Sequence, residues 1–131
     1  MRTIVLFVLA LGVHSFANAE DHEVTLDSYL YSVSQLKEVR PATVDQGYFL
    51  LERIVKAGGK VDRVNMEKIM KVHLFLLQND KTNWGPELLA PLFNANKQLY
   101  QDVLKTFKPA EIELIKRRQK VFERESKEGN G

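Results

Sequence analysis

The chain has 131 residues, no cysteine, and 19 basic against 17 acidic side chains, which gives a net charge of +2. Without cysteine it forms no disulfide and offers no thiolate to a structural zinc, so we expect no metal site. The near balance of charge argues against nucleic acid as the main partner, because dedicated binders carry a clear basic excess.

Residues 1–19 have the pattern of a secretory signal peptide. A basic start at Arg2 precedes the uncharged, mostly apolar run 4–13, and small residues follow at Ala17 and Ala19, the two positions that a signal peptidase recognises. The apolar run is shorter than the about 20 residues that span a bilayer. We therefore expect cleavage after Ala19, a secreted extracellular protein (periplasmic in a bacterium), and no stable membrane insertion.

Residues 20–131 are expected to form a single all-helical domain, a compact bundle of about five helices. No segment alternates apolar and polar residues for long, as a half-buried strand would. The core is predicted over about 25–124, with a charged C-terminal tail that frays from about Ser126. Helix packing must stabilise this domain, since no disulfide is available.

The first helix is predicted over about 25–39, because the proline at position 41 disfavours helical geometry in the residue before it. The second is predicted from Thr43, which with Gln46 has the form of a capping box. It ends at the glycine pair 58–59, since glycine adopts the left-handed conformation of a helix C-terminus.

The third helix is predicted from an N-cap at Asp62 to Gln78 and is placed at the centre of the bundle. Its segment 72–77 is apolar nearly all round, which is typical of a helix buried on most sides. Gly47 interrupts the second helix at a cost of up to about 1 kcal/mol relative to alanine. We interpret it as a point where a neighbouring helix approaches closely.

The segment 79–85 is rich in turn residues and predicts a loop. Two prolines then indicate a short turn at 86–90 and a longer helix over 91–107. Pro109 is expected to open the last helix.

Two features are candidates for binding a partner protein: the sole tryptophan, Trp84, in the predicted loop, and the basic stretch Lys116, Arg117, Arg118 and Lys120. Tryptophan is enriched among residues that dominate interfaces, although Trp84 also fits a hydrophobic staple at the entry to the next helix. The basic stretch suits an acidic protein, a heparin-like sugar or lipid headgroups. Its alternative is a solvated face paired with Glu113 and Glu123.

His73 is the one polar side chain within the apolar stretch of the third helix. It suits a general base, a ligand contact or a pH sensor, and equally a core histidine bonded to a nearby carbonyl or hydroxyl. A cavity for an apolar ligand is a further hypothesis, and its candidate lining residues, which otherwise form core, are Tyr48, Met66, Met70, His73, Phe75 and Leu77.

Catalysis has little support in the sequence. The chain has no Gly-X-Ser-X-Gly elbow and no His-Glu-X-X-His pair. The glycines at 58–59 follow a predicted helix instead of preceding one, so they do not indicate a phosphate loop. We expect neither an enzyme nor a cofactor.

In size, predicted export and helix content the chain is similar to insect odorant-binding and chemosensory carriers, which depend on conserved cysteines that are absent here. It also resembles the small, secreted, all-helical proteins of arthropod saliva, venom and parasite secretions. This second resemblance implies an effector or inhibitor that binds an extracellular partner protein, which is the leading functional hypothesis. The alternative is an extracellular carrier of a hydrophobic small molecule.

Overall fold

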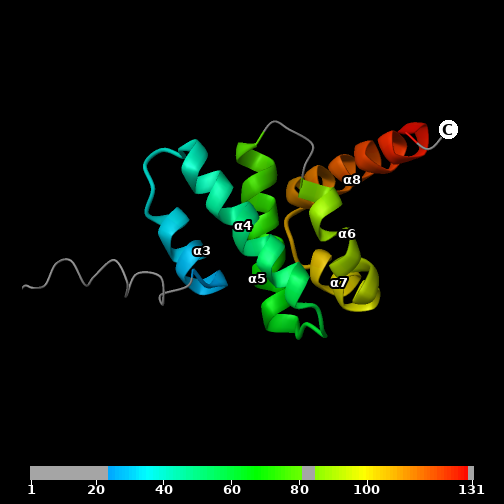
Figure 1. Ribbon diagram of the computed structural model, residues 1–131, viewed down its shortest axis with the longest axis horizontal. Coiled ribbons are helices and arrows are strands. Elements are labelled where there is room, and N and C mark those ends of the chain that lie inside the picture. The colour runs from blue at the N-terminus through cyan, green and yellow to red at the C-terminus, as the bar shows by residue number, and fades with distance from the viewer. Residues whose placement is uncertain (1–23, 81–84, 130–131) are drawn as a thin grey trace, which may run out of the picture.

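Six helices pack together in the computed structural model, which describes residues 24–80 and 85–129 (Figure 1). In chain order they are α3 (Leu26–Ser34), α4 (Pro41–Ala57), α5 (Arg63–Asn79), α6 (Gly85–Ala95), α7 (Lys97–Leu104) and α8 (Pro109–Gly129). These two ranges contain no strand, so the predicted all-helical class is confirmed, with six helices where the sequence indicated about five. Within the same ranges, no helix is long and apolar enough to cross a membrane. The predicted signal peptide lies outside them and stays a prediction.

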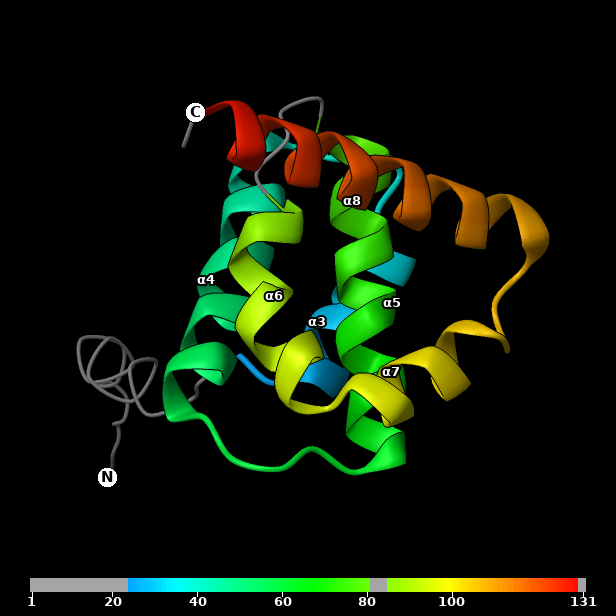
Figure 2. The same cartoon turned by 90° about the vertical axis from the view of Figure 1, so that its right-hand side faces the viewer.

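The central helix is α5, as its apolar sequence predicted. It contacts all five other helices, and Figure 2 shows it running through the middle of the bundle, with α8 crossing its C-terminal end. Asp62 caps its first turn, since the carboxylate accepts a 2.8 Å hydrogen bond from the Asn65 amide. Its buried residues are Met66, Ile69, Met70, Val72, His73, Leu74, Leu76 and Leu77.

α4 begins at Pro41, earlier than the predicted start at Thr43. Proline suits the first turn of a helix because its φ is already helical and no N–H partner is needed there. The helix ends before Gly58, whose φ of 68° lies in the left-handed region that glycine adopts without steric cost. The predicted glycine stop is therefore confirmed.

Gly47 lies where α4 meets its neighbours α3 and α5. A Cβ at this position would stand 2.5 Å from Oη of Tyr29 and 2.8 Å from Cδ2 of Leu76. The Tyr29 hydroxyl also donates a 2.7 Å hydrogen bond to the Thr43 carbonyl, which fixes it against α4. The predicted close approach is confirmed, because only glycine leaves room for these two side chains.

α3 is shorter than predicted. Its start agrees with the sequence, since Thr25 and Ser28 form a reciprocal capping box through hydrogen bonds of 3.0 and 2.9 Å. The helix ends at Ser34, whereas the sequence predicted about residue 39. The remaining residues form the connection to α4.

The middle of the chain differs from the prediction of a turn at 86–90 followed by one helix over 91–107. α6 runs through Pro91, and a break at Asn96 separates it from α7. The Asn96 amide donates to a carbonyl one turn earlier at 2.9 Å and accepts from the Val61 N–H at 3.5 Å. Because a side chain that bonds to the backbone competes with helix hydrogen bonds, it favours the break at this point.

α8 begins at Pro109, as predicted. The Glu111 carboxylate accepts a 3.0 Å hydrogen bond from the Lys108 amide at the start of the helix. Ile115 is fully buried, and the helix packs on α5 and α6. The structure continues α8 to Gly129, beyond the point near Ser126 where the sequence predicted fraying.

Candidate functional site

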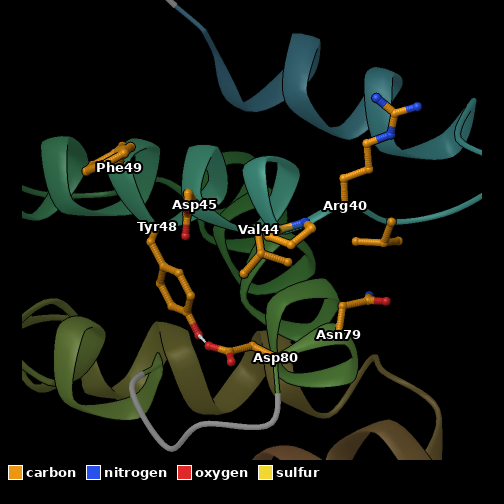
Figure 3. Close-up of a pocket in the computed structure, with 9 residues that line it drawn as sticks. Arg40, Val44, Asp45, Tyr48, Phe49, Asn79 and Asp80 are labelled. Carbon is orange, nitrogen blue, oxygen red and sulfur yellow. Dashed lines mark hydrogen bonds between the residues drawn. The ribbon is translucent and has the colours of Figure 1, made fainter.

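A groove lies between the N-terminal half of α4 and the C-terminal end of α5 (Figure 3). Its volume is about 720 Å³, and its lining residues are Val39, Arg40, Pro41, Val44, Asp45, Tyr48, Phe49, Asn79 and Asp80. Positions 41, 44, 45, 48 and 49 share one side of α4 because residues three and four apart are neighbours on a helix. The groove therefore needs both the periodicity of α4 and the place where α5 ends.

The Tyr48 side chain crosses from α4 to the end of α5. Its hydroxyl donates a hydrogen bond to the Asp80 carboxylate, and Figure 3 shows the ring spanning the gap between the two helices. The Asp80 amide is held in turn by a 2.7 Å hydrogen bond to the Leu76 carbonyl. These bonds fix one wall of the groove before any ligand arrives.

The other parts of the groove are open to solvent. Asp45 points toward the end of α5, whereas Phe49 and Arg40 point away from it (Figure 3). Phe49 is 67% exposed and Val39 is 37% exposed. No ion pair joins Asp45 to a cation within the part of the chain that the structure describes. The groove thus combines a fixed aromatic wall, an exposed aromatic rim and an unpaired carboxylate.

The predicted basic stretch is divided between two sides of α8. Lys116, Arg117 and Lys120 line a shallow hollow on the outer side of the helix, together with Arg124. Arg118 lies on the inner side, where its guanidinium donates to the backbone carbonyls of two residues at the end of α5, at 3.2 and 2.8 Å. Arg118 therefore caps the C-terminus of α5, where a positive charge is favourable.

His73 is buried in the core, with 1% of its surface exposed. Its ring meets that of Phe93 edge-to-face at 6.0 Å. Among the residues that the structure describes, neither ring nitrogen has a hydrogen-bond partner, so the predicted bond to a carbonyl or hydroxyl is not present. Burial, and secondarily the charge of Arg118, lowers the pKa of His73 to about 4. The imidazole is therefore neutral at physiological pH.

The residues predicted to line an apolar cavity lie almost entirely in the packed core. Met66 and Met70 have no exposed surface, and Leu77 is 4% exposed. Phe75 is half-buried, and its ring meets that of Tyr29 edge-to-face, with 6.1 Å between the ring centroids. Of the six predicted residues, Tyr48 lines the α4–α5 groove.

Trp84, the remaining predicted binding residue, lies outside the described residues, and its exposure stays a prediction. Sequence reasoning missed the groove because it grouped Tyr48 with residues of the third helix, either as the lining of an apolar cavity or as core. The available signal was the pair of polar residues, Asn79 and Asp80, at the end of an apolar helix.

In the described part of the chain, no three acidic or histidine side chains cluster closely enough to hold a metal ion. Comparisons of the chain with protein families, curated proteins and solved structures gave no match.

Proposed function

We propose that this chain is a secreted helical protein that acts by binding a partner protein, and that the α4–α5 groove is its binding face. The observation that carries the proposal is the combination of a preformed groove with an exposed aromatic rim at Phe49. Aromatic side chains at the centre of an interface supply a disproportionate share of binding energy. The signal-peptide pattern of residues 1–19 supports an extracellular partner.

The groove favours a particular kind of partner segment. The hydrogen bond from Tyr48 to Asp80 holds the aromatic wall in place, which lowers the ordering cost of binding. The apolar lining residues Val39 and Val44 suit a large apolar side chain. The unpaired carboxylate of Asp45 suits a basic residue beside it. We therefore expect a partner segment that presents an apolar anchor next to a lysine or arginine.

A second candidate function uses the same groove. Its volume of about 720 Å³ lies within the range of roughly 300–1,000 Å³ that is typical of small-molecule sites. A carrier of a hydrophobic small molecule would therefore hold its ligand here, because the predicted cavity residues Met66 and Met70 are buried in the packed core.

The test compares two exposed aromatic residues. Phe49, on the groove, is 67% exposed, and Tyr31, on α3 and not among the groove-lining residues, is 68% exposed. Purified parent, Phe49→Ser and Tyr31→Ser are used to retain proteins from extracellular fluid of the source, and the retained protein is then purified and its dissociation constant measured. We expect parent and Tyr31→Ser to bind alike and Phe49→Ser to bind at least 10-fold more weakly, with equal thermal midpoints.

Equal binding by all three variants would reject the groove as the binding face. Failure to retain any protein would reject the partner hypothesis. Native mass spectrometry of the same parent preparation separates the carrier function, which requires a bound apolar molecule that is lost in Phe49→Ser and kept in Tyr31→Ser.

A further inference from the structure

The outer side of α8 carries cations at intervals of four residues. Lys116, Lys120 and Arg124 are each four residues apart, so they follow one another on the same side of the helix. They span about 12 Å at 1.5 Å per residue. Arg117 lies beside them, and all four line the same hollow. We call Lys116, Lys120 and Arg124 the basic row.

The basic row faces solvent and forms no ion pair with the acidic side chains that the structure describes. All three side chains are exposed, and no ion pair of 4 Å or less involves them in the described residues. Glu113 lines the same hollow and is close in sequence to Lys116, yet the two form no ion pair. No ion pair joins Glu113 to Arg117 either, so the part of the sequence alternative that involves Glu113 is absent. The Glu123 side chain lies outside the described residues, and its pairing stays a prediction.

The cation on the inner side of α8 is bonded to the protein, unlike those of the basic row. Arg118, two residues from both Lys116 and Lys120, is rotated by about 160° from either one on a helix of 3.6 residues per turn. It donates to carbonyls at the end of α5. The fold thus uses this one cation for packing and leaves the basic row free to meet an anion.

We propose that the basic row binds a sulfated polysaccharide, a linear polyanion that can lie along this series of cations. Among the residues with described side chains, no aromatic residue lines the row, whereas single-stranded nucleic acids are bound by aromatic stacking. The apolar residues among the described lining side chains are Pro109 and Ile112, at one end of the hollow. A helix that lies in a membrane surface needs a broad apolar face, and a protein interface needs a central apolar anchor. Neither is present among the described side chains that line the row.

The test measures binding of a heparin oligosaccharide of defined length at 0.15 M NaCl. The row variant is the triple substitution Lys116→Gln, Lys120→Gln and Arg124→Gln. The control is the triple substitution Lys60→Gln, Lys97→Gln and Arg63→Gln, which removes the same charges from exposed positions outside the hollow. We expect the row variant to bind at least 10-fold more weakly than the control, with thermal midpoints equal to that of the parent.

The parent should also lose affinity as salt rises, because binding to a polyanion releases counterions. Contacts from the three cations of the basic row and from Arg117, four in all, give a loss of roughly 10- to 100-fold between 50 and 200 mM salt, taking single-stranded nucleic acid as a guide. Phe49→Ser should bind heparin like the parent, since Phe49 is not in the hollow. That control separates this proposal from the function of the α4–α5 groove.

Three results would overturn the proposal. Equal losses in the row variant and the control would show that only net charge matters. No measurable heparin binding by the parent would exclude the site. Tighter binding to polyglutamate, to oligothymidylate or to phosphatidylglycerol vesicles than to heparin would assign the row to an acidic protein, a nucleic acid or a membrane instead.

Discussion

Acidification should destabilise this protein through one buried side chain, His73. In the folded state its pKa is lowered to about 4, first by burial and then by the charge of Arg118. In the unfolded chain the imidazole has its ordinary pKa of about 6.5. Between these two values the unfolded state binds a proton that the folded state excludes, so stability is complete above about pH 6.5 and falls as the pH drops toward 4.

The expected size follows from the separation of the two pKa values. Each pH unit over which only the unfolded state holds the proton corresponds to about 1.4 kcal/mol. Between pH 7 and pH 5 this interval runs from about 6.5 to 5, so the free energy of unfolding should fall by about 2 kcal/mol. For a domain of this size, a loss of 2 kcal/mol is a large part of a total stability of about 5–15 kcal/mol. Carboxylates titrate mostly below this window, which isolates the histidine.

The assay is urea denaturation of the parent and of His73→Leu at pH 5, 6 and 7. Leucine has a similar size and brings no polar atom into the core. His73 has no hydrogen-bond partner among the described residues, so the substitution removes no hydrogen bond from the folded state. The variant should be at least as stable as the parent at pH 7 and should lose about 2 kcal/mol less on going to pH 5. A parent whose stability is flat over this range, or a variant with the same pH slope, would refute the buried neutral histidine.

Two further substitutions test the packing around α4 and α5. Gly47→Ala should destabilise the fold by about 1–3 kcal/mol in urea denaturation, because the added Cβ overlaps Tyr29. The cost of this overlap exceeds the roughly 1 kcal/mol of helix propensity that alanine gains over glycine. A more stable variant would contradict the close approach. Arg118→Met should cost about 1–3 kcal/mol by removing charged donors from the end of α5, and it should raise the pKa of His73 in an NMR titration. An unchanged His73 pKa would contradict the proximity of the two side chains.

Local chemistry made several parts of the fold predictable from sequence. The cap at Asp62 and the glycine stop at Gly58 depend on neighbouring residues alone. The central position of α5 follows from its apolar surface. The break at Asn96 was not predictable in this way, because it involves a hydrogen bond to Val61, which lies 35 residues earlier in the chain.

The candidate sites also combine features that depend on local sequence with contacts between segments distant in sequence. The four cations of residues 116–120 look alike in sequence, although helix geometry alone places Arg118 opposite Lys116 and Lys120. What Arg118 bonds to became known only from the packing of α8 on α5. The groove could not be predicted at all, since it forms where Tyr48 of α4 meets Asp80 at the end of α5, a contact between segments distant in sequence.

The most direct test of the proposed function is the dissociation constant of a purified extracellular partner for Phe49→Ser and Tyr31→Ser. The two side chains are equally exposed, and only Phe49 lines the α4–α5 groove. Binding through the groove predicts that Phe49→Ser weakens the complex at least 10-fold while Tyr31→Ser leaves it unchanged. Equal dissociation constants for the two variants would contradict the groove as the site of partner binding.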